Sequence, residues 1–196
     1  MKKKPVLILI IMSVMLIMTA CTARISISKL NESTVVVTEE GEIVEISIED
    51  FGESYYSFDD LSIFVNDTVK EFNDRHIVSG SAITIGTMEE VDEKARVEMS
   101  FTDAKAYEAF HDIIFINTDI SGLSEETRGL TYITHDKREE IDVFSLEDSD
   151  KYKTLVTDDT LNLMIEGKIE YYSHNVQLID KNHVKTADEL SVIIYK

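Results

Sequence analysis

Residues 34–48, TVVVTEEGEIVEISI, decide the fold class of this chain. Two β-branched runs flank the turn Glu39-Glu40-Gly41, a pattern that predicts a β-hairpin. The second run alternates between Val44, Ile46 and Ile48 on one face and Glu45, Ser47 and Glu49 on the other. Because side chains alternate across a strand, we expect the apolar face to pack and the polar face to meet water.

The next segment predicts an amphipathic helix. Ser57 has the features of an N-cap, with Asp60 three residues later. Apolar residues then follow one helical stripe to about residue 74: Phe58, Leu61, Phe64, Val65, Val69 and Phe72. We expect a helix of about four turns with one buried side.

The chain then returns to strands. Residues 82–88 and 94–101 alternate as a second β pair, joined by the acidic segment 89–93. Thr102 is expected to cap a short helix that turns Tyr107 and Phe110 inward. Residues 113–116 predict a short apolar strand, and residues 124–130 a further helix.

After Thr131 the sequence is typical of short strands, at residues 131–134, 141–144, 152–156, 161–165, 169–172, 176–179 and 190–195. Together these predictions give an α+β domain over residues 34–196, with dominant antiparallel sheet and two or three helices. The sequence leaves open whether the late strands join the first sheet or form a second subdomain that begins near residue 130.

The first 20 residues have the organisation of an export signal. Three lysines precede an apolar run from Val6 to Met18, and two small residues then precede Cys21, the only cysteine of the chain. This order resembles a bacterial lipobox, so we expect a lipoprotein signal peptide over residues 1–20 and a diacylglyceryl group on Cys21. One alternative is an uncleaved membrane helix, although about 13 apolar residues fall short of the roughly 20 that span a bilayer. The other is a secretory signal with a coincidental cysteine, since Met18 stands where leucine is more usual.

The predicted lipid group on Cys21 implies a cellular location for the domain. Because each buried methylene contributes about 0.8 kcal/mol, two acyl chains such as palmitate hold a protein durably on a membrane. We therefore expect the domain on the extracytoplasmic side of the cell membrane, with residues 21–33 as a lipidated tether. Acylation of Cys21 also leaves no thiol for a disulfide, so the domain depends on its core.

The composition is strongly acidic. The chain has 19 Lys and Arg against 38 Asp and Glu, and without the three signal lysines the balance of 16 against 38 gives a formal charge of −22. Such a surface repels nucleic acid and anionic lipid headgroups, so nucleic-acid binding is not expected. The charge favours solubility outside the membrane and is compatible with a basic partner or a cation.

Three parts of the chain carry a family resemblance: residues 34–73, the phrase Ser100-Phe101-Thr102-Asp103-Ala104-Lys105-Ala106-Tyr107-Glu108-Ala109-Phe110, and the ending from Gly167-Lys168-Ile169-Glu170-Tyr171-Tyr172-Ser173 to Lys196. The chain resembles the uncharacterised small lipoproteins of clostridial, gut-dwelling Gram-positive bacteria. The resemblance implies a surface location and an α+β domain. It implies no activity and no catalytic residues.

The residues give no specific catalytic or metal motif. The G-x-S-x-G pattern of serine hydrolases is missing, and the cysteine is assigned to the anchor. The five histidines, at positions 76, 111, 135, 174 and 183, have no zinc-site spacing, so we expect surface or loop histidines. Asp148-Ser149-Asp150 begins like a calcium loop, but Tyr152 and Lys153 stand where an oxygen ligand and glycine are required. We predict no cofactor.

Acidic and aromatic pairs leave two further functions open. Five carboxylate pairs could serve glycoside hydrolysis or hold a divalent cation: Asp59/Asp60, Glu89/Glu90, Asp92/Glu93, Glu139/Glu140 and Asp158/Asp159. Tyr55-Tyr56 and Tyr171-Tyr172 could form a platform for a sugar or peptide, although in a strand one residue of each pair would face the core. The prediction is a non-enzymatic binding module of the cell envelope with a protein or glycan partner; the alternatives are an envelope glycoside hydrolase and a cation-binding module.

Overall fold

The computed structural model describes residues 25–76, 80 and 82–196. Within them the chain forms three α-helices and 13 strands, arranged in two sheets in which antiparallel pairs dominate. The predicted α+β fold class is confirmed. The expected signal peptide and Cys21 lie outside the described residues.

The first sheet has seven strands. Their order is β11 (Gln177–Asp180), β12 (His183–Lys185), β9 (Asn162–Ile165), β1 (Thr34–Val37), β2 (Ile43–Asp50), β4 (Lys94–Phe101) and β3 (Ile83–Val91). β1 and β2 form the predicted hairpin, with Val36 opposite Val44. Among the recorded strand pairs, β1 and β9 are parallel and the others antiparallel.

The second sheet has six strands. Their order is β5 (Phe115–Asp119), β8 (Lys153–Thr157), β13 (Ser191–Tyr195), β10 (Ile169–Ser173), β6 (Tyr132–Thr134) and β7 (Glu140–Ile141). All five of its recorded strand pairs are antiparallel.

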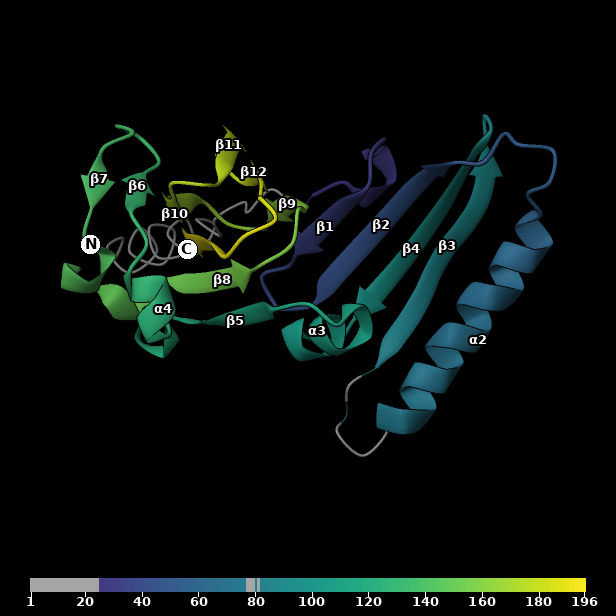
Figure 1. Cartoon of the computed structure of the whole chain (residues 1–196), viewed down its shortest axis with the longest axis horizontal. Coiled ribbons are helices and arrows are strands. Elements are labelled where there is room, and N and C mark those ends of the chain that lie inside the picture. The colour runs from purple at the N-terminus through teal and green to yellow at the C-terminus, as the bar shows by residue number, and fades with distance from the viewer. Residues whose placement is uncertain (1–24, 77–79, 81) are drawn as a thin grey trace, which may run out of the picture.

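The helices lie on and between the sheets. α2 (Phe58–His76) lies along β3, and α3 (Ala104–His111) lies between the long strands β2, β4 and β3 and the second sheet (Figure 1). α4 (Glu125–Arg128) is a single turn. Four 3₁₀ turns complete the described elements: η2 (Ile27–Lys29), η3 (Ile120–Gly122), η4 (Val143–Ser145) and η5 (Ser149–Lys151).

One main core joins the two sheets and two helices. It contains Val35 and Ile43 of the first sheet, Leu155 and Ile193 of the second, and Phe72 of α2. A second cluster, including Val143 and Val192, covers the other face of the six-stranded sheet. A third, built on Val36, Val44 and Ile46, covers the other face of the seven-stranded sheet.

The structure corrects the predicted boundaries of several elements. Asp103, not Thr102, caps α3, because its carboxylate accepts a hydrogen bond from the Ala106 backbone NH at 2.8 Å. The connection between β3 and β4 is not the whole acidic segment 89–93: it consists of Asp92 and Glu93, which both adopt positive φ angles. Such angles suit a two-residue hairpin turn, so the strands extend further than their acidic side chains indicated.

The later half of the chain differs from the prediction in two further places. Residues 141–144 form the end of β7 and a 3₁₀ turn, not one strand. The strand β12 was not predicted, because His183-Val184-Lys185 is too short to give a periodic signal. On the question that the sequence left open, the late strands are distributed over both sheets: β9, β11 and β12 join the first, and β8, β10 and β13 join β5 in the second.

Candidate functional site

The candidate site is a polar cleft of about 190 Å³ beside the main core. Strand β2 forms one wall with Glu45, Ser47 and Glu49, α3 contributes Tyr107, and the β8–β9 connection and the start of β9 contribute Thr160 and Asn162. The cleft thus lies where the first sheet, α3 and the strands of the later half of the chain meet.

Glu45 is the central charged group of this cleft. Its strand pairing places it between Val35 of β1 and Met99 of β4, on the same face as these core residues. The Glu45 carboxylate lies 2.9 Å from Nε2 of His111, at the end of α3, and its second oxygen accepts a hydrogen bond from the Ser47 hydroxyl at 3.3 Å. The side chains of Glu45 and His111 are only 14% and 27% exposed. Both carboxylate oxygens therefore have partners, as partial burial of a charge requires.

This position corrects the expected faces of the hairpin. Glu45 and Ser47 were expected to meet water, but both are half-buried because their face of β2 borders the main core. The opposite face, with Val44 and Ile46, is covered by the residues that precede β1. Both faces of β2 are thus covered, and the polar face is the one that lines the cleft.

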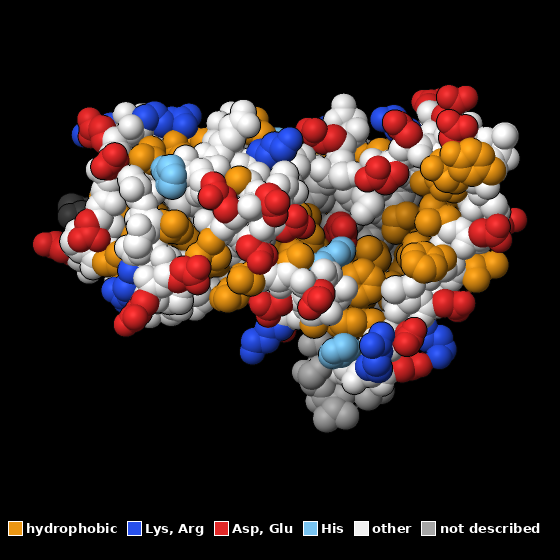
Figure 2. Space-filling view, viewed as in Figure 1, with side chains coloured by type: hydrophobic (Ala, Val, Ile, Leu, Met, Phe, Trp, Pro, Cys, Tyr) orange, Lys and Arg blue, Asp and Glu red, His pale blue; other side chains and the backbone are white. Residues whose placement is uncertain are grey.

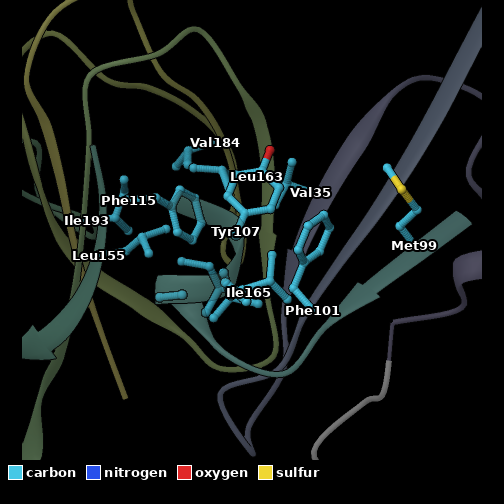
Figure 3. Packing of buried hydrophobic residues seen from close by; sticks show 14 of the residues in the cluster. Val35, Met99, Phe101, Tyr107, Phe115, Leu155, Leu163, Ile165, Val184 and Ile193 are labelled. Carbon is cyan, nitrogen blue, oxygen red and sulfur yellow. The ribbon is translucent and has the colours of Figure 1, made fainter. Parts of the chain in front are cut away.

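Tyr107 supplies the second notable group. Only 2% of this residue is exposed, and its ring packs against Phe101 and Phe115 at centroid distances of 5.0 and 4.5 Å. Figure 3 shows the ring beside Phe115 and Phe101, with its hydroxyl directed toward Val35, another residue of the cleft wall. Within the described residues, the fully buried side-chain atoms without a hydrogen-bond partner are Thr38 Oγ1 and Asn175 Oδ1, and the Tyr107 hydroxyl is not one of them.

The Tyr107 hydroxyl remains a hydrogen-bond donor. Burial, followed by the negative charges of Glu45 and Asp159, raises its pKa well above the ordinary value for tyrosine. The group therefore stays protonated at neutral pH and can donate to an oxygen of a ligand in the cleft.

The geometry does not follow the order of a nucleophilic triad. In such a triad the histidine lies between the nucleophile and the acid, and takes the proton of the nucleophile. Here the Glu45 carboxylate contacts both Ser47 and His111. The arrangement holds the Glu45 carboxylate in place beside the cleft.

The carboxylate pairs predicted from the sequence lie on different elements. Asp59 and Asp60 are in the first turn of α2, Glu89 and Glu90 lie near the end of β3, and Asp92 and Glu93 form the turn between β3 and β4. Glu139 and Glu140 line a hollow of about 350 Å³ together with Glu170, His135 and Tyr171. Asp158 accepts a hydrogen bond from the Ile114 backbone NH at 2.9 Å, and Asp159 follows it. The glycoside hydrolase stays a prediction.

The histidines are also dispersed, and His111 was not distinguished from the others by sequence. His76 stacks on Phe72, His135 lies 2.8 Å from Asp136, and His183 hydrogen-bonds Asn162. Over the described ranges 25–76, 80 and 82–196, no three His, Cys, Asp or Glu side chains group as they would around a metal ion. The Asp148 segment is a 3₁₀ turn in which Lys151 pairs with Asp148 at 2.8 Å.

The two tyrosine pairs differ. Tyr172 is buried in the main core, and Tyr171 packs against the second cluster on the opposite face of β10, as expected for a strand. Tyr55 and Tyr56 instead lie in the connection between β2 and α2, and both are exposed. They belong to a region of exposed hydrophobic side chains over and beside α2, visible in Figure 2, whereas acidic side chains are spread over the whole visible face.

The partnership of Glu45 and His111 had no signal in the sequence. Sixty-six positions separate them in the sequence. They meet because β2 and α3 both contribute to the main core. The sequence shows only a carboxylate inside a β-branched run and a histidine at the end of a predicted short helix. Each is common on a protein surface, so neither indicates a contact.

Comparison of the chain with protein-family models, with curated proteins and with solved structures found no match. No helix in the described part of the chain is both long and apolar enough to cross a membrane.

Proposed function

We propose that this chain is a lipid-anchored extracytoplasmic binding module, without enzymatic activity, that holds a small hydroxylated ligand in the cleft beside Glu45. The observation that carries the proposal is the Tyr107 hydroxyl, a donor of a largely buried side chain that reaches the cleft wall and is not one of the fully buried unpartnered atoms. A ligand oxygen in the cleft could accept a hydrogen bond from this hydroxyl.

The size and lining of the cleft favour a sugar residue. Its volume of about 190 Å³ lies below the roughly 300–1,000 Å³ of sites for drug-sized ligands, so it suits one small group. Ser47, Thr160 and Glu49 add hydroxyl and carboxylate groups to the wall. A glycan of the cell envelope is the proposed partner, because the lipobox-like sequence at Cys21 would place the domain among such glycans.

A thermal-shift titration of the full-length chain in detergent tests the ligand site. Probes are N-acetylglucosamine, glucosamine and galactose, and we expect at least one to raise the melting temperature in a saturable way. Tyr107→Phe keeps the packed ring and should abolish this rise. The matched control is Tyr132→Phe, which also removes the hydroxyl of a largely buried tyrosine but lies outside the cleft. An equal rise in Tyr107→Phe, or no rise with any sugar, would contradict the proposal.

Cell fractionation tests the anchor separately. Cys21→Ala should move the protein from the membrane fraction to the medium or leave its signal uncleaved, whereas Thr22→Ala should do neither. Unchanged fractionation and processing of Cys21→Ala would refute lipid anchoring and leave the ligand site untouched.

A further inference from the structure

The residues that precede β1 are a folded part of the domain. Ile25, Ile27 and Leu30 pack against the third cluster, on the face of the first sheet that carries Val36 and Val44. Residues 21–33 were expected to form a tether, but the described part of that segment, from Ile25 onward, covers apolar surface of the sheet.

Arg96 holds the middle of this segment. It lies on β4, and its guanidinium donates hydrogen bonds to the backbone carbonyls of Leu30 at 2.8 Å and Ile27 at 2.9 Å. Its side chain is only 13% exposed and lies 3.8 Å from the Glu89 carboxylate. The planar fork of arginine can reach two carbonyls at once in fixed directions, which the single ammonium of lysine does less well.

Both ends of the segment are also fixed. The Ile25 backbone NH donates to the Glu166 carboxylate at 3.1 Å, and the other oxygen of the same carboxylate accepts from the Glu39 NH at 3.4 Å. At the far end, the Ser33 hydroxyl donates to the Ile48 carbonyl at 3.0 Å and accepts from the Ile48 NH at 2.8 Å. The segment is therefore bound at its first residue, its middle and its last residue.

We infer that residues 25–33 are a clamp that holds the domain at the surface of its membrane, and not a spacer that lets it extend into the envelope. The inference rests on the proposed lipidation of Cys21. Four Cα steps separate Cys21 from Ile25, and an extended chain covers at most about 14 Å over that length. The clamped end of the first sheet, beside Glu39 and Glu166, then lies close to the lipid headgroups.

Trypsin treatment of intact membranes tests the clamp. In an Arg24→Gln background, which removes the preceding cleavage site, the remaining bond of interest is Lys29–Leu30, flanked by the two carbonyls that Arg96 binds. The native segment should resist cleavage. Arg96→Ala should increase the rate of cleavage at this bond at least tenfold, and Arg96→Lys should give an intermediate rate.

The controls separate a released clamp from an unfolded protein. Lys94→Ala removes a positive charge from the same strand at an exposed position and should leave the rate unchanged. In Arg96→Ala the increase should be confined to the Lys29 bond, with other lysine and arginine sites still protected. Rapid cleavage at Lys29 in the native chain, at the rate of Arg96→Ala, would overturn the clamp.

Energy transfer tests the distance to the membrane. A donor dye on Glu39→Cys, beside the clamped end, is paired with an acceptor on lipid headgroups of vesicles that carry the lipidated protein. A 20-residue Gly-Ser insertion between Arg24 and Ile25 has a typical span of about 25 Å and should lower the transfer efficiency clearly. Equal transfer with and without the insertion would overturn membrane proximity. Failure of the protein to be lipidated or to associate with vesicles would instead refute the anchor, so the two failures are distinguishable.

Discussion

Two largely buried tyrosines, Tyr132 and Tyr195, make the stability of the domain depend on pH. The Tyr132 hydroxyl donates to the Thr127 carbonyl at 2.8 Å, and the Tyr195 hydroxyl to the Asn117 side chain at 3.2 Å. Burial raises the pKa of each from 10.0 to about 12. The folded chain therefore binds these protons more tightly than the unfolded chain does.

This shift predicts a loss of stability in alkali. Where the folded pKa is the higher one, the stabilisation is complete below the unfolded pKa of 10.0 and disappears as the pH rises toward about 12. We expect the free energy of unfolding, measured with urea at pH 8, 10 and 11, to fall across this range. The double variant Tyr132→Phe, Tyr195→Phe should be less stable at pH 8 but fall less steeply. An equal fall would contradict the assignment.

At the scale of elements, α2 shows how packing selects one side of an amphipathic helix. The Ser57 hydroxyl accepts a hydrogen bond from the Asp60 NH at 3.2 Å, as expected of an N-cap. Val69 and Phe72 are buried, but Phe64 of the predicted stripe is 67% exposed. Phe64 lies at the margin of the apolar stripe of α2. Because α2 packs mainly on the single strand β3, the buried side of the helix is narrower than its apolar side.

Two substitutions on α2 test this difference. Phe72→Ala should lower the free energy of unfolding by about 3–5 kcal/mol, because it opens a cavity in the main core. Phe64→Ala is the matched control and should change it by less than about 0.5 kcal/mol. Chemical denaturation with a common slope measures both, and similar losses for the two variants would show that Phe64 is packed.

At the scale of the whole molecule, the chain passes repeatedly between the two sheets. β8 joins the second sheet, β9 joins the first beside β1, and β10 returns to the second. The main core contains residues of both sheets, α2 and α3. The two halves of the sequence therefore depend on each other for their strand pairs.

This interleaving predicts one cooperative unfolding transition for the whole domain. Calorimetry should give a single peak with equal calorimetric and van't Hoff enthalpies. A chain that ends after residue 130 should fail to fold, because β1 would lose its partner β9 and β5 its partner β8. Two separate transitions, or a folded fragment of residues 22–130, would show that the sheets are independent.

The sequence by itself determined the α+β class and most individual elements, because alternation and helical periodicity are local. The β1–β2 hairpin, the Ser57 cap and the apolar side of α2 follow from residues within a few positions of each other. The strands β7 and β12 were not predicted with these bounds, because two or three residues are too few to show a clear alternation.

Only the tertiary structure decided that the polar face of β2 is also covered, which sheets the late strands join, and what residues 25–33 contact. Each depends on contacts between residues far apart in the chain: Glu45 with His111, β1 with β9, and Arg96 with Leu30. A polar side chain in a strand has the same local pattern whether it faces water or a cleft. Long-range packing makes that choice, so the candidate site became visible only in the folded chain.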